Sequence, residues 1–87
     1  MEREAVTKWV EENVHDEVLL ADGFEEAFLG LAERSGMALV AAYDRNKCID
    51  ILVQRDEMSY DEAREFFEFN TLGAWVGELT PVFLTLA

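Results

Sequence analysis

The chain has 87 residues, and its 19 acidic against 7 basic side chains give a formal net charge of −12 at neutral pH. This balance argues against direct binding to nucleic acid or to an anionic membrane surface, because both need basic side chains. With 51% hydrophobic and 11% aromatic residues, the composition also excludes the low-hydrophobicity class that stays disordered. Size scaling predicts a single core, with about two thirds of the extended chain's surface buried on folding.

The sequence carries no targeting or membrane signal that we can identify. Residues 1–8 lack the basic start, apolar middle and cleavage site of a signal peptide. The longest apolar runs, residues 37–43 and 81–87, have the length of strands and fall far short of the ~18 residues that cross a bilayer. We therefore expect a cytoplasmic protein.

The first half of the chain is predicted to contain a helix, a strand and a second helix. Apolar side chains recur at helical spacing over residues 2–14. Residues 17–21 form a short apolar stretch, closed by Asp22-Gly23, that is typical of a buried strand. The spacing of Asp22 and Glu25 resembles a capping box and predicts a second helix, which Ser35-Gly36 ends. Its inward face is expected to consist of Phe24, Ala27, Phe28 and Leu31.

The second half is predicted to contain a strand, two paired helices and a final strand. Residues 37–43 are apolar on both alternating faces, which favours an interior strand. Asp44 caps the next helix and Ser59 opens another, so that residues 44–69 form an αα-hairpin. Val82–Leu84 is expected to be the last strand, and Pro81 restricts it to an edge or makes that proline its first residue. The second hairpin helix is expected to turn inward Ala63, Phe66 and Phe67.

Together these elements predict one α+β domain over residues 1–87, with about three short strands packed with about four helices. The last strand is apolar, so we expect the C-terminal segment to lie in the fold rather than in a loose tail. Deletion of the last six residues should then unfold the protein.

Side chains that carry catalysis or hold metals are few. His15 is the only histidine and falls in a polar stretch, whereas Cys48 is the only cysteine and falls on an apolar helix face typical of a core residue. Residues 56–62 lack the central glycine of a calcium loop, and the glycines form no phosphate-binding motif. We expect no catalytic residue, no metal and no cofactor. An enzyme is the least favoured hypothesis, because carboxylate pairs arise by chance among so many acids.

The helix expected over residues 60–69 carries the most concentrated group of acids. Asp61, Glu65 and Glu68 fall at i, i+4 and i+7, and Glu62 flanks them. Only Arg64 offsets them locally. Like charges at this spacing repel one another, a cost that folding does not require.

Phe69 is predicted to project beside Glu62 rather than with the inward-facing Phe66 and Phe67. An aromatic side chain on an acidic face can anchor a partner whose rim is basic. The alternative is a merely solvated face, with Phe69 turned back into the core beyond the helix end. The candidate partner-binding residues are Asp61, Glu62, Glu65, Glu68 and Phe69. Trp75 is a second candidate anchor, although we favour its packing under the last strand.

Several segments between Val18 and Leu84 together resemble a group of known proteins. They are residues 21–28 (ADGFEEAF), 40–45 (VAAYDR), 58–63 (MSYDEA), 68–70 (EFN), 73–78 (GAWVGE) and 80–83 (TPVF). In this order they resemble small, largely uncharacterised acidic proteins encoded by bacteriophages and prophages. The resemblance covers about three quarters of the chain and brings no catalytic residues with it.

A phage setting implies the host-cell cytoplasm and a class of partner. Small acidic phage proteins often inhibit host nucleic-acid enzymes, including nucleases of restriction and CRISPR systems. Such enzymes line their channels with Lys and Arg, and carboxylates on a rigid helix can imitate phosphate charge there. The leading hypothesis is therefore a non-enzymatic, anti-defence inhibitor that mimics DNA on a basic protein surface.

The alternative is a small accessory or self-assembling phage protein, with a homodimer among its forms. It would use Trp75, Phe83 and the apolar C-terminal segment as the contact, and an exposed edge strand would allow strand addition. The acidity would then serve only solubility.

Overall fold

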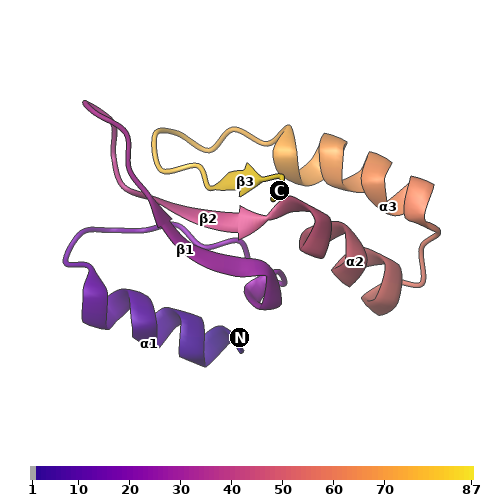
Figure 1. The fold of residues 1–87 in the computed structure, drawn as a ribbon, viewed down its shortest axis with the longest axis horizontal. Coiled ribbons are helices and arrows are strands. Elements are labelled where there is room, and N and C mark those ends of the chain that lie inside the picture. Colours follow the sequence, from indigo (N-terminus) through magenta and orange to yellow (C-terminus); the bar gives the residue numbers. More distant parts are fainter. Residues whose placement is uncertain (1) are drawn as a thin grey trace.

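The computed structural model describes residues 2–87, which form three α-helices beside a three-stranded sheet (Figure 1). In chain order the elements are α1 (Arg3–Asn13), the 3-10 turn η1 (Glu25–Ala27), β1 (Phe28–Ala32), β2 (Val40–Asp44), α2 (Arg45–Arg55), α3 (Tyr60–Phe67), the π-helical turn η2 (Glu68–Leu72) and β3 (Val82–Leu84). The expected α+β class is confirmed, with three α-helices in place of about four. In Figure 1, α2 and α3 lie together at one end of the sheet, and α1 lies below β1.

The sheet has the order β1-β2-β3, with β1 antiparallel and β3 parallel to the central β2. The first four residues of β2 are buried, which confirms the predicted interior strand, although it begins at Val40 rather than Met37. β3 pairs with β2 along one side and lies at the sheet's edge, as the proline that precedes it predicts. α2 and α3 form the crossover that a parallel β2–β3 pair requires.

The second predicted helix is wrong. Its expected residues form the short turn η1 and then strand β1, and no side chain caps the turn. Gly30, with φ of +144°, lies at an irregularity in the β1–β2 register, where a left-handed backbone favours glycine. Ser35-Gly36 turns the chain between the two strands rather than ending a helix. Pairing with β2 therefore overrides a local helix preference.

The strand predicted over residues 17–21 is also wrong. These residues have no strand partner and cross the core as an irregular segment, in which Val18, Leu20 and Ala21 pack partly buried against the cluster described below. The backbone N–H of Ala21 donates a 2.7 Å hydrogen bond to the Tyr43 hydroxyl. The tyrosine side chain thus satisfies one backbone N–H of a segment that has no strand partner.

Both predicted caps of the α2–α3 pair are confirmed. The Asp44 carboxylate accepts a hydrogen bond from the backbone N–H of Lys47, and Ser59 with Glu62 forms a complete capping box. α3 ends at Phe67 rather than Phe69, because the chain widens there into η2.

The core is an aromatic and aliphatic cluster between the sheet and the α2–α3 pair. Tyr43 stacks on Phe83 at 5.8 Å between ring centroids, and Phe83 meets Phe67 edge to face at 5.0 Å. α1 joins this assembly from the β1 side through an edge-to-face contact of Trp9 with Phe28 at 5.8 Å. The fully enclosed members include Tyr43, Cys48, Ile49, Leu52, Ala63 and Phe67.

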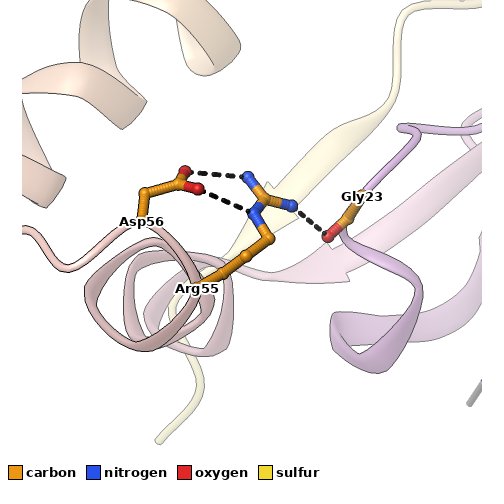
Figure 2. A network of polar contacts seen from close by, with 3 residues as sticks. All are labelled: Gly23, Arg55 and Asp56. Carbon is orange, nitrogen blue, oxygen red and sulfur yellow. Dashed lines mark hydrogen bonds and ion pairs between the residues drawn. The ribbon is translucent and has the colours of Figure 1, made fainter.

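Arg55 ties the C-terminal end of α2 to the turn before η1 (Figure 2). Its guanidinium donates to both carboxylate oxygens of Asp56, at 3.2 and 3.1 Å, and to the Gly23 carbonyl at 3.0 Å. It also lies 5.7 Å above the ring centroid of Phe24. Gly23 has a φ of +93°, a backbone conformation that favours glycine, and a Cβ there would come within 2.7 Å of this guanidinium.

None of the described helices has both the length and the apolar character that crossing a membrane requires.

Candidate functional site

The exposed side of α3 holds most of the predicted partner-binding residues, and a capping box fixes where that helix starts. The backbone N–H of Glu62 donates to the Ser59 hydroxyl at 3.2 Å, and the Ser59 backbone N–H donates to the Glu62 carboxylate at 3.1 Å. Hydrogen bonding by the Ser59 backbone, and then by its hydroxyl, holds the pKa of Glu62 below its ordinary value. The Glu62 carboxylate is therefore a fixed negative charge on this side of α3.

Phe69 extends into solvent beside these acids. Its side chain is 82% exposed, the largest fraction among the large hydrophobic residues described. A shallow hollow of about 400 Å³ brings together Met58, Glu62, Glu65, Phe66, Phe69 and Asn70. The alternative in which Phe69 turns back into the core is therefore wrong. Phe69 lies beside Glu62 as predicted, but it shares the hollow with Phe66, from which the prediction had separated it.

The other two predicted residues lie outside the hollow. Asp61 is exposed in the first turn of α3, where a carboxylate also favours the helix dipole. Glu68 instead forms an ion pair with Arg45 at 3.0 Å, and that guanidinium lies 5.7 Å above the ring centroid of Phe67. We use the name acidic face of α3 for Asp61, Glu62 and Glu65 together with Phe69, which follows the helix in η2.

Arg45 and Phe66 are residues at this site whose placement the sequence analysis missed. The prediction that Phe66 faces inward is wrong, because it is 40% exposed and lines the hollow. Helical spacing could have shown this, since Phe66 follows Glu62 by four residues and precedes Phe69 by three. The predicted αα-hairpin could have suggested the pairing of Arg45 with Glu68, because in such a hairpin the start of the first helix lies beside the end of the second.

Trp75 lies apart from the acidic face, on the segment between η2 and β3. It is 74% exposed, so the prediction that it packs under the last strand is wrong. It borders a groove of about 230 Å³ whose apolar lining is formed by Ala32, Met37, Ala38, Val40, Trp75 and Val82. Glu33, Arg34, Glu78 and Thr80 complete that lining.

Residues with catalytic or metal-binding chemistry do not gather at either surface. Cys48 is fully buried, as predicted, and burial, followed by the charge of Asp44, raises the pKa of its thiol to about 12. His15 is exposed after the end of α1. Over residues 2–87, no three His, Cys, Asp or Glu side chains are placed to hold a metal ion.

Comparison of the chain with protein-family models, with curated proteins and with solved structures finds no match in any of the three.

Proposed function

We propose that this protein binds another protein, one with a basic surface, through the acidic face of α3. The observation that carries the proposal is Phe69, an aromatic side chain that is 82% exposed and lines the same hollow as Glu62 and Glu65. Aromatic side chains are enriched among the few residues that dominate binding energy in interfaces. An exposed aromatic side chain next to charged residues therefore resembles an interface anchor, and the charged residues would form the polar rim around it.

The charge of the acidic face supports a basic partner. Among residues 2–87, no Lys or Arg lies within ion-pair distance of Asp61, Glu62 or Glu65, whereas Glu68 is neutralised by Arg45. Unpaired carboxylates on a chain of net charge −12 attract cationic surfaces over a Debye length of ~8 Å at physiological salt. Such charge steers association and selects the partner more than it adds affinity.

The partner class that this chemistry fits best is an enzyme that holds nucleic acid. The basic channel of such an enzyme is shaped for a rigid array of negative charge, and α3 is held rigid by its capping box and by the buried Phe67. The resemblance to small acidic phage proteins supports the same class. We therefore propose a non-enzymatic inhibitor, of the anti-defence type, that occupies a nucleic-acid-binding surface of a host protein.

Capture at two salt concentrations tests this function. The full chain, immobilised by a tag, is exposed to host-cell lysate at about 50 and about 500 mM salt, concentrations that differ strongly in screening. We expect a nucleic-acid-binding protein to be retained at low salt and released at high salt. Retention that is equal at both concentrations, or no nucleic-acid-binding protein at either, would refute the proposal.

A further inference from the structure

The C-terminal segment of the chain differs sharply in charge from the rest. Residues 70–87 contain a single charged side chain, Glu78, whereas the preceding 69 residues contain all 25 others. The same segment holds half of the large hydrophobic residues that are exposed: Leu72, Trp75, Val76, Val82, Leu84 and Leu86. We call these six residues the neutral face.

The neutral face includes an open sheet edge. β3 bonds to β2 along one side, and no other described strand pairs with its outer side. Phe83 packs inward on Tyr43 and Phe67, so the alternation of a strand turns Val82 and Leu84 the other way, where both are exposed. An edge with apolar side chains and free backbone groups is a template for another strand.

Next to this edge lies the groove bordered by Trp75. Val82 of β3 and Met37 of the β1–β2 connection both line it, so the groove and the open edge form one continuous surface. Met37 is itself exposed. The surface thus offers strand pairing and an apolar recess side by side.

We infer that a second copy of this chain covers the neutral face, with β3 pairing with the β3 of that copy. Charge favours this occupant, because two molecules of net charge −12 repel each other wherever their acidic surfaces meet. At the neutral face two copies oppose few carboxylates, since only Glu33 and Glu78 line the adjoining groove and Arg34 lies in the same lining. A two-fold axis between them makes the β3 pair antiparallel and joins two three-stranded sheets into one of six strands.

The exposed area is large enough for one interface of standard size. The chain exposes 6003 Å², whereas size scaling gives about 5,200 Å² for a compact chain of this mass. The excess of about 800 Å² is close to the area that each partner buries in an interface of standard size. Burial of one such interface would reduce the accessible area of the chain to the value expected for a protein of its mass.

Sedimentation equilibrium over micromolar to millimolar protein, at about 50 and about 500 mM salt, tests the inference. We expect a monomer–dimer equilibrium that tightens at high salt, because screening weakens the residual repulsion while apolar burial persists. If the chain stays monomeric at every protein and salt concentration, the inference is overturned. This outcome includes the case in which the neutral face binds a different protein. Association that weakens as salt rises would also overturn the inference.

Variants locate the contact. Leu84→Lys should weaken dimerisation about tenfold or more, because it places a charge on the paired edge. Trp75→Ala should weaken dimerisation to a similar extent. Because Trp75 is 74% exposed, this substitution leaves the core intact and keeps the test valid if Leu84→Lys fails to fold. Phe69→Ala is the matched control, an exposed aromatic on the other surface, and should leave dimerisation unchanged. Wild-type dimerisation by a folded Trp75→Ala protein would overturn the assignment, and loss of dimer in Phe69→Ala would do so too.

Discussion

At the scale of single residues, two phenylalanines two positions apart have opposite environments. Phe67 is fully buried against Phe83 and Phe24, whereas Phe69 is 82% exposed. We predict that Phe67→Ala lowers the free energy of unfolding by about 3–5 kcal/mol, the range for deletion of a core aromatic. Phe69→Ala should change it by less than about 0.5 kcal/mol, as surface substitutions do.

Urea denaturation of both variants measures this pair of effects. The variants share one helix end and one type of substitution, so they serve as controls for each other. A loss of about 2 kcal/mol or more in Phe69→Ala would place its ring in the core and remove the anchor from the proposed binding face.

The Cys48 thiol gives a prediction of reactivity. Its pKa is raised to about 12 in the folded protein, and the thiolate is the form that reacts with alkylating reagents. Because this pKa is higher in the folded than in the unfolded chain, the thiol's contribution to the free energy of unfolding is fully present below the pKa of the unfolded thiol. That contribution is lost as the pH rises toward about 12.

We expect Cys48 in the native chain to resist iodoacetamide at pH 8 and to react fully in denaturant. Mass spectrometry of the labelled protein checks both states. Rapid alkylation of the native chain would contradict the buried placement of this residue.

Residue-level predictions succeeded where the signal is local. The Asp44 cap and the Ser59–Glu62 capping box depend on spacings of three residues, and both form. The burial of Trp75 was predicted wrongly because nothing within its own segment determines what covers it.

At the scale of elements, β3 connects the sheet to the helix pair. Phe83 touches Tyr43 of β2 and Phe67 of α3, so β3 supplies a ring that both layers share. We predict that deletion of residues 82–87 abolishes the cooperative thermal transition.

Circular dichroism melting tests this against deletion of residues 85–87, which follow β3 and are exposed. The shorter deletion should keep a cooperative transition. A normal melting curve for the longer one would show that the core does not need β3.

The helices α1, α2 and α3 could be predicted from the sequence because amphipathic periodicity and caps are written within each segment. β1 could not be, because its residues favour a helix locally and become a strand only by pairing with β2. Gly30 was the available warning, since a glycine inside a predicted helix costs about 1 kcal/mol relative to alanine. Residues 17–21 show the opposite error, a strand predicted where none forms, because an apolar run can be partly buried without a strand partner.

At the scale of the whole molecule, charge is unevenly distributed, because residues 70–87 carry only one of the chain's charged side chains. The acidic face of α3 and the neutral face share none of their residues, and they predict opposite responses to salt. Binding to a basic partner should weaken as salt rises, whereas self-association should strengthen. The near absence of charge in residues 70–87 can be counted in the sequence, but only the folded chain shows that six of their large apolar side chains are exposed.

The central claim is that the acidic face of α3 binds the basic partner, and the affinity of matched charge variants for the captured protein tests it most directly. Asp61→Lys/Glu65→Lys reverses two charges on that face, and Glu11→Lys/Glu17→Lys makes the same net change at exposed positions elsewhere. We expect titration calorimetry to show a loss of about 100-fold or more for the first variant and a far smaller loss for the second. Equal losses in the two variants would show that only net charge matters and would contradict the assignment of the binding face.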